Sequence, residues 1–146
     1  MKKIIIILVL IILAGGVFYL FLQKSPMPEN KDKIVSINKH ELRVEIVNDA
    51  QERAKGLGER ESLCDSCGML FEFPEKEKYS FWMKDMNFPL DIIWISGDKI
   101  VYIVKNISYN FKGSINSDIE ANRVLEINAG MTDEYGIKEG DKVIVK

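Results

Sequence analysis

The chain has 146 residues, of which 47% are hydrophobic and 29% are charged, a composition typical of a folded protein and not of a disordered one. The net charge of −2 is unevenly distributed: residues 1–24 carry three lysines and no acid, which leaves 17 basic and 22 acidic residues, a net charge of −5, in the remainder. Because nucleic-acid binding requires a cationic surface, we expect no nucleic-acid partner.

The first predicted element is a membrane anchor. The segment Ile4–Leu22 contains nineteen residues and no charge, and a helix of that length nearly spans a hydrocarbon core of about 30 Å. Secretory signal peptides have shorter apolar segments, and no small-residue cleavage motif follows Leu22. Lys2 and Lys3 place the N-terminus on the cytoplasmic side. We therefore predict a single-pass anchor over residues 1–24 in the cell membrane, with the C-terminal domain outside the cytoplasm.

A linker and a β-hairpin follow the anchor. Residues 25–33 contain two prolines and a run of charges, which is typical of a solvated linker. The remaining residues, 34–146, have the length of one domain. The apolar, β-branched runs Ile34–Ile37 and Leu42–Val47 flank the polar segment Asn38–Glu41, and this pattern predicts a hairpin.

A short helix and then a series of strands are predicted next. Asp49, with Glu52 three positions later, has the pattern of a helix N-cap, and Gly56 and Gly58 end the helix. Beyond it the apolar residues alternate or form continuous runs, as they do in strands. The predicted strands are Met69–Phe73, Tyr79–Met83, Asp91–Ile95, Lys99–Ile107, Arg123–Asn128 and Val143–Val145.

The connections complete the expected fold. Ser96–Asp98 is predicted as a hairpin loop, Met131–Ile137 as a helical turn, and Tyr109–Ala121 as a loop or mobile flap. Seven or eight short strands with one or two short helices, and no regular alternation of the two, predict a mainly β (α+β) domain. We expect a small antiparallel β barrel or sandwich behind an N-terminal transmembrane helix.

Several motifs in this region resemble one known family. They are Gly56–Arg60, Gly68–Phe73, Phe81–Ile95, Val124–Gly130 and Gly136–Asp141. In this order they closely resemble the domain-of-unknown-function family 192, over about Ile34 to Lys146. The resemblance implies a small β-rich domain, often behind a signal or an anchor, and it implies no activity. The Cys64–Cys67 pair is not part of that pattern.

Four residues are candidate ligand-binding residues: Arg60, Trp82, Lys84 and Asp91. Side chains alternate between the two faces of a strand, so Trp82 and Lys84 share a face that we expect to point toward solvent or a cleft. An aromatic ring stacks on sugars and other rings, and a cation binds an anion. The alternative is a structural role, in which Trp82 covers the core, Lys84 is solvated, Asp91 accepts hydrogen bonds from turn amides and Arg60 pairs with a carboxylate.

Cys64 and Cys67 form a C-x-x-C pair. Outside the cytoplasm a local structural disulfide is the expected state, with redox chemistry or metal binding as alternatives. A zinc site needs about four ligands, and His40 is the single histidine, predicted to be solvated in the hairpin turn. We therefore expect no metal, no cofactor and no catalytic triad.

The function predicted from these patterns is a non-enzymatic binding or interaction module that is anchored in the membrane. Its ligand is an unidentified small molecule or a component of the cell envelope. The alternative is an envelope enzyme, either a hydrolase or a thiol-dependent redox protein that uses Cys64 and Cys67. No catalytic residue is assigned.

Overall fold

The computed structural model describes residues 32–146. The anchor predicted over residues 1–24 and all but the last two residues of the predicted linker lie outside the described residues. Within 32–146, no helix has both the length and the apolar character needed to cross a membrane.

The described part of the chain is mainly β, with two short helices. In chain order the elements are β1 (Asp32–Ile37), β2 (His40–Val47), α2 (Ala50–Lys55), β3 (Cys67–Glu77), β4 (Ser80–Trp82), β5 (Leu90–Ser96), β6 (Lys99–Ile107), β7 (Ser114–Asn116), β8 (Ala121–Asn128), α3 (Met131–Glu134) and β9 (Val143–Val145). Each strand predicted from the sequence is present, and so are both predicted helices.

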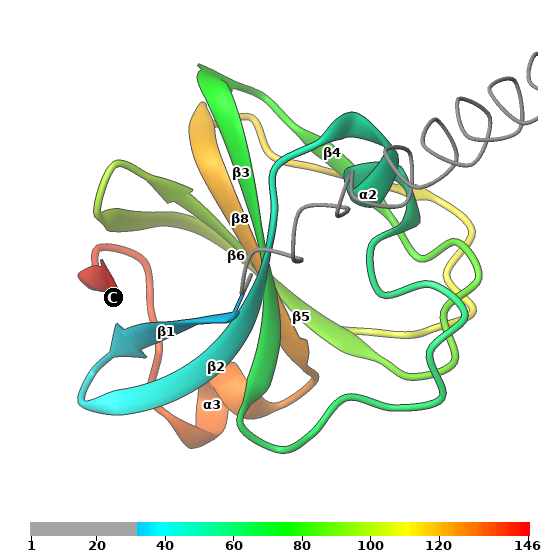
Figure 1. The fold of residues 1–146 in the computed structure, drawn as a ribbon, viewed down its shortest axis with the longest axis horizontal. Helices are drawn as coiled ribbons and strands as arrows, with labels where there is room; N and C mark the ends of the chain where they lie inside the picture. Colours follow the sequence, from blue (N-terminus) through cyan, green and yellow to red (C-terminus); the bar gives the residue numbers. More distant parts are fainter. Residues whose placement is uncertain (1–31) are drawn as a thin grey trace, which may run out of the picture. The chain divides into compact units, whose positions relative to one another are not determined.

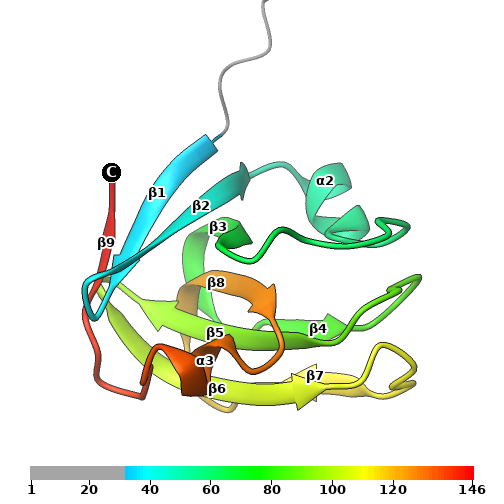
Figure 2. The ribbon, with the colours of Figure 1, turned by 90° about the horizontal axis from the view of Figure 1, so that it is seen from below.

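Seven of the strands form one strongly curled sheet, in the order β6-β5-β8-β3-β2-β1-β9 (Figures 1 and 2). At one end its two edges meet: Lys99 forms a β-bridge with Lys142, and the Ile100 amide donates to the Asp141 carbonyl at 3.0 Å. β4 and β7 form a separate two-stranded ribbon. The architecture is therefore a half-barrel that is closed at one end.

One strand pair differs from the predicted antiparallel arrangement. β2 and β3 are parallel, with Val44 opposite Gly68 and Ile46 opposite Leu70. Parallel neighbours require a crossover of about a dozen residues or more, and α2 with the segment that follows it supplies that length between Val47 and Cys67. The two-turn helix was too short to be recognised as a crossover from the sequence.

Local sequence signals account for the first hairpin and for α2. Asn38 and Lys39 have φ values of 50° and 71°, as the two-residue turn between twisted strands requires. The Asp49 side chain accepts a hydrogen bond from the Glu52 amide at 2.8 Å and caps the helix. Both predictions are confirmed.

The segment Tyr109–Ala121, predicted as a loop or flap, contains β7. This strand pairs with β4, placing Ile115 opposite Phe81 and Ser114 opposite Trp82. Three residues are too few to show a period in the sequence, so the strand is defined by its partner. Ile115 is buried, and it attaches this segment to the core.

The central strands β3, β5 and β8 are buried on both faces. Leu70, Ile93 and Leu125 belong to one apolar cluster, which also contains Met131 after β8. Side chains of the opposite faces, including Phe71 and Trp94, belong to a second cluster, together with residues of β4, β7 and the segment after α2. Burial on both faces explains why these strands appear as continuous apolar runs in the sequence.

Candidate functional site

A hollow of about 450 Å³ lies against the β4–β7 ribbon. It is lined by Trp82, Met83, Lys84, Asp85, Phe111, Lys112, Gly113 and Ser114. We call it the Trp82 pocket. It contains two aromatic rings and two lysines, so it combines an apolar surface with positive charge.

The alternation of β4 directs Trp82 outward. Phe81 packs edge-on against Phe71, with ring centroids 5.0 Å apart, and Met83 is buried. Between them, Trp82 is 61% exposed, and Phe111, which also lines the pocket, is 44% exposed. The sequence correctly placed Trp82 on the outer face of this strand.

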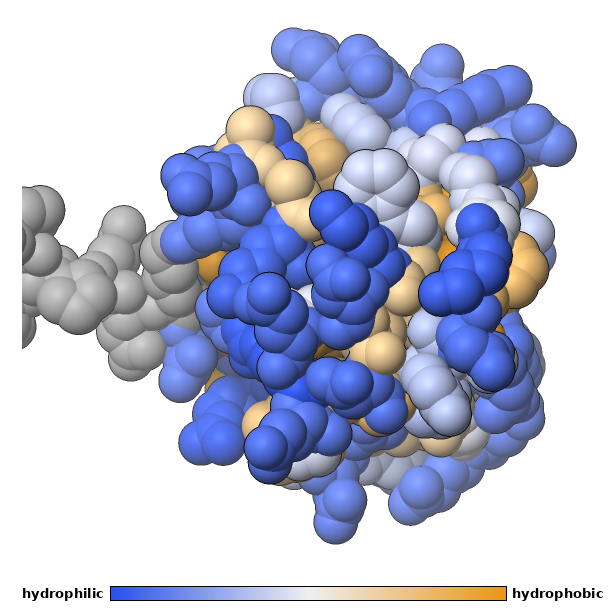
Figure 3. Space-filling view, turned by 90° about the vertical axis from the view of Figure 1, so that its right-hand side faces the viewer, coloured by the Kyte–Doolittle hydropathy of each residue, from blue (hydrophilic) through white to orange (hydrophobic). Residues whose placement is uncertain are grey.

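The face of the domain that lies at the right of Figure 1 is mostly hydrophilic (Figure 3). Hydrophobic residues appear on it in small areas among hydrophilic ones, so this face has no broad apolar area. Neither Lys84 nor Lys112 is ion-paired within residues 32–146. The pocket lining contains one acid, Asp85, which does not pair with either lysine. The two lysines are therefore available to an anionic group.

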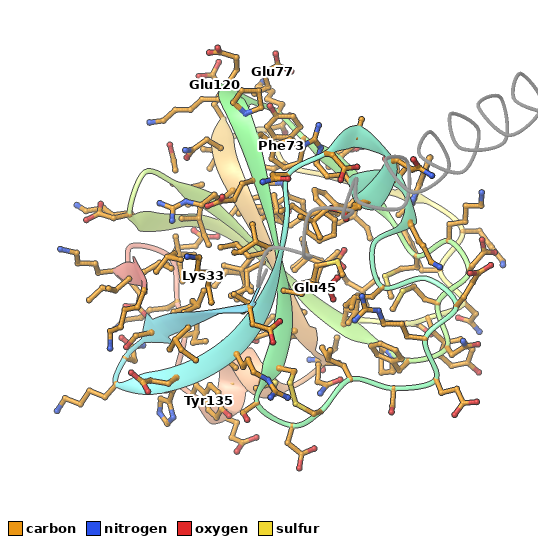
Figure 4. All side chains as sticks on the ribbon, in the orientation of Figure 1. Lys33, Glu45, Phe73, Glu77, Glu120 and Tyr135 are labelled. Carbon is orange, nitrogen blue, oxygen red and sulfur yellow. A yellow bond between two sulfur atoms is a disulfide. The ribbon has the colours of Figure 1, made fainter. Side chains whose placement is uncertain are left out.

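Arg60 lies in a second hollow of about 330 Å³, which also includes Glu45, Lys55 and Glu59. Its Nη2 is 2.6 Å from Oε2 of Glu45, a β2 residue labelled in Figure 4, and both side chains are 39% exposed. The guanidinium is thus engaged by a carboxylate, as the structural alternative predicted. The structure does not bring Arg60 into the Trp82 pocket.

Asp91 is fully buried, and four donors reach its carboxylate. Oδ1 accepts from the Asn106 amide at 2.7 Å. Oδ2 accepts from the amides of Gly130 and Thr132, at 3.1 and 3.0 Å, and from the Thr132 hydroxyl at 2.7 Å. Asp91 therefore ties β5 to β6 and to the start of α3, and it lines none of the hollows described here. This placement supports the structural alternative.

Glu126 is a residue that the sequence reasoning missed. It lies on β8 between Leu125 and Ile127 and is 4% exposed. Burial raises the pKa of its carboxyl to about 8. Alternation along the strand puts Glu126 on the face opposite Leu125, and the second apolar cluster covers that face as well. An acid inside an apolar, doubly buried strand was the available signal.

Cys64 and Cys67 form the predicted disulfide, with their Cα atoms 5.1 Å apart. Nη2 of Arg43 donates to Sγ of Cys67 at 3.6 Å, and Cys64 is exposed. His40 is exposed as predicted, but its ring also stacks on Tyr135, labelled in Figure 4, with centroids 4.1 Å apart. Across residues 32–146 no group of three or more His, Cys, Asp or Glu residues is arranged to hold a metal ion.

Comparisons with known proteins match the domain to a family and to solved structures. The profile of DUF192, described as "Uncharacterized ACR", matches residues 33–145. A putative transcription regulator from Sinorhizobium meliloti 1021 is 31% identical, with a TM-score of 0.76, over 78% of this chain and 93% of its own. A protein of unknown function from Novosphingobium aromaticivorans is 32% identical, with a TM-score of 0.75, over 82% of this chain and 89% of its own. A search of curated proteins finds no match.

Proposed function

Because the chain belongs to the DUF192 family, which is described as uncharacterized, its function has to be inferred from its own site, and we propose a membrane-anchored, non-enzymatic module that binds an anionic, ring-containing ligand of the cell envelope. The Trp82 pocket is the binding site. The observation that carries the proposal is the exposure of Trp82 and Phe111 beside two lysines without carboxylate partners in the described residues.

The geometry favours a ligand with a flat apolar face and a negative charge. Trp82 and Phe111 offer ring surfaces for stacking on a sugar or another ring. Lys84 and Lys112 offer ammonium groups to a carboxylate or a phosphate. The volume of 450 Å³ falls within the range of small-molecule pockets, about 300–1,000 Å³. An acidic oligosaccharide combines all of these features.

The binding test uses the full-length protein in mild detergent and the tetrasaccharide of hyaluronan, which alternates uronic acids with N-acetylated sugars. We expect Trp82→Ala and Lys84→Ala each to weaken binding at least tenfold, measured by calorimetry. The melting temperature should stay nearly unchanged, because both side chains are exposed. The neutral chitin tetrasaccharide should bind more weakly than the acidic one.

Tyr109→Ala is the matched control, because Tyr109 is 50% exposed but does not line the pocket. It should bind like the wild type. The proposal is wrong if the wild type binds neither tetrasaccharide, or if Trp82→Ala binds the hyaluronan fragment unchanged. A large drop in melting temperature in Trp82→Ala would instead assign Trp82 to the core.

The placement of the domain outside the cytoplasm is part of the proposal. It is supported by the uncharged segment Ile4–Leu22 behind Lys2 and Lys3, and by the Cys64–Cys67 disulfide, since disulfides persist in oxidising compartments. Protease added to intact spheroplasts should degrade the domain, and alkaline washing should leave the protein in the membrane. Recovery of the full-length chain in the soluble fraction would refute this placement.

The name of the Sinorhizobium protein raises DNA as an alternative ligand. The net charge of −5 beyond residue 24 opposes it, because the phosphate backbone repels an acidic surface. We expect no change in the fluorescence anisotropy of a labelled duplex at low salt. Salt-dependent binding of that duplex at micromolar protein would contradict this expectation.

A second candidate function, thiol–disulfide exchange, is favoured by one contact. The Arg43 guanidinium beside Sγ of Cys67 stabilises a thiolate there, so a substrate thiol that attacks the exposed Cys64 sulfur would release Cys67 as the leaving group. Electrons then pass from the substrate dithiol to the protein pair. Arg43→Leu should slow this exchange, measured with a dithiol peptide, and an unchanged rate would exclude the mechanism.

A further inference from the structure

Glu126 lies in the middle of the second apolar cluster. The register places it opposite Met69 of β3 and Ile92 of β5, both of which are buried. The space in front of its carboxyl is bounded by Gly56, where an added Cβ would stand 4.0 Å from Oε2 of Glu126 and 3.4 Å from the Phe71 ring. The segment that follows α2 therefore borders the carboxyl at this glycine.

No side chain or amide within residues 32–146 forms a hydrogen bond or an ion pair with the Glu126 carboxyl. The carboxyl faces a cavity and not a protein partner, and an apolar side chain of the same size would avoid the cost of burying a polar group. The contrast with Asp91, whose oxygens accept four hydrogen bonds, shows that this fold can satisfy a buried acid. The Glu126 carboxyl is therefore left open to something that binds it.

A small cavity of about 30 Å³ lies at the carboxyl. Its walls include Trp82 and Lys84, which also line the larger Trp82 pocket, so the two spaces share a wall. One bound water needs about 10–15 Å³. The cavity is thus large enough for a single polar group and too small for a sugar ring, which fits one substituent of a ligand whose body occupies the Trp82 pocket.

The charges around the cavity select the kind of group. Arg53 and Lys55 of α2 and Lys84 after β4 are its basic residues, Glu126 is its one acid, and β3 contributes apolar Phe71. The flanking positions on β3 and β5, Met69 and Ile92, carry no charge. Three basic residues disfavour a cationic group, and the apolar wall disfavours a buried anion. An uncharged polar group is the class that remains.

None of the three cations forms an ion pair with Glu126 within residues 32–146, and two of them are engaged elsewhere. Arg53 donates to the carbonyls of Asn48 and Glu72, and Lys55 is 3.2 Å from a carboxylate oxygen of Glu59. Burial raises the pKa of Glu126 to about 8, so the carboxyl keeps its proton at neutral pH and can donate it in a hydrogen bond.

We propose that Glu126 is the hydrogen-bonding residue of a second, buried subsite, which takes an uncharged carbonyl or hydroxyl oxygen of the molecule bound in the Trp82 pocket. The inference rests on the proposed function and specifies the ligand further: it carries a ring, a negative charge and a protruding uncharged oxygen. N-acetylated acidic sugars, with amide carbonyls, and plain acidic sugars, with hydroxyls alone, both supply such an oxygen.

The test measures binding of two probes to the full-length protein in detergent: the hyaluronan tetrasaccharide, which has acetamide and hydroxyl groups, and tetragalacturonic acid, which has hydroxyls without an amide. Glu126→Leu should weaken binding at least fivefold, while Glu126→Gln, which keeps a donor and an acceptor, should stay within twofold of the wild type. Loss for both probes identifies a hydroxyl, and loss for the hyaluronan fragment alone identifies the amide carbonyl.

Two further readouts separate ligand binding from a structural role. Glu126→Leu should melt at the same temperature as the wild type or higher, because it removes an unpartnered polar group. Wild-type affinity should fall above pH 8 as the carboxyl ionises, and Glu126→Gln should show no such fall. Lys84 faces the same cavity in both proteins, so its titration cancels in this comparison.

The results that overturn the two proposals differ. If the wild type binds neither probe, the binding function itself fails, and the subsite with it. If Trp82→Ala abolishes binding while Glu126→Leu binds normally, the subsite alone is wrong. If Glu126→Leu and Glu126→Gln both lower the melting temperature, Glu126 is a structural residue.

Discussion

The buried carboxyl of Glu126 should make the folded domain less stable as pH rises from 5 to 8. Its pKa is raised from 4.5 to about 8 in the folded protein by burial. Below pH 4.5 the group is protonated in both the folded and the unfolded chain and contributes no pH dependence. Between the two values the unfolded chain loses its proton while the folded chain keeps it, so rising pH favours unfolding.

The size of the effect follows from the shift. Each pKa unit corresponds to about 1.4 kcal/mol, so the loss of stability reaches about 3 kcal/mol at pH 7 and on the order of 4–5 kcal/mol above pH 8, where it levels off. For a domain of this size, a loss of 4 kcal/mol lowers the melting temperature by roughly 10–20 °C. The change is large enough to measure against the titration of the exposed acids.

The assay compares the wild type with Glu126→Gln, which cannot ionise, at pH 5, 6, 7 and 8. The other acids titrate in both proteins, so the difference between their free energies of unfolding isolates Glu126. Glu126→Gln should gain stability relative to the wild type at each step. Glu120→Gln is the matched control, because Glu120, labelled in Figure 4, is exposed. Parallel curves for the wild type and Glu126→Gln would refute the reasoning.

Three further substitutions probe the frame around the site. Asp91→Ala removes the acceptor of four hydrogen bonds and should cost about 4 kcal/mol or more in urea unfolding, and a loss below about 1 kcal/mol would contradict its structural role. Replacing Cys64 and Cys67 by serine opens a very short loop and should cost about 2 kcal/mol relative to the oxidised wild type. The reduced wild type should lose the same amount, and a different loss would point to an effect of the serines themselves. Gly68→Ala places a Cβ 2.9 Å from the Glu126 carbonyl, so it should cost about 1–3 kcal/mol, and a neutral result would show that β3 and β8 can separate without strain.

Much of the secondary structure was predictable because its signals are local. The turn at Asn38, the cap at Asp49 and the apolar runs of the strands depend on neighbouring residues, and the structure confirms them. The parallel pairing of β2 with β3 and the strand β7 depend on partners far along the chain. No window of sequence contains that information, so both were missed.

The candidate site was predictable only in its exposed part. Alternation along β4 was sufficient to place Trp82 outside, since the faces of a strand follow from its period. The buried acids could not be separated in this way. Asp91 and Glu126 both lie in apolar runs of the sequence. Only the folded chain shows that the amides of Gly130 and Thr132 donate to Asp91, and that no amide of the described residues donates to the Glu126 carboxyl.

The two acids lie on opposite faces of the sheet: one face uses its acid to tie elements of the fold together, and the other is the face for which we propose a ligand. Asp91 and Glu126 lie on adjacent strands, with Asp91 opposite Ile127 and Ile92 opposite Glu126, so their side chains enter opposite clusters. On the first face the hydrogen bonds to Asp91 fasten α3. On the second face, the segment after α2 and the β4–β7 ribbon leave a cavity at Glu126. Substituting Asp91 should therefore lower stability, and any loss of binding should follow from that loss of stability. Glu126→Leu should instead weaken binding while the stability is kept. The same response from both substitutions would mean that the two faces do not have separate roles.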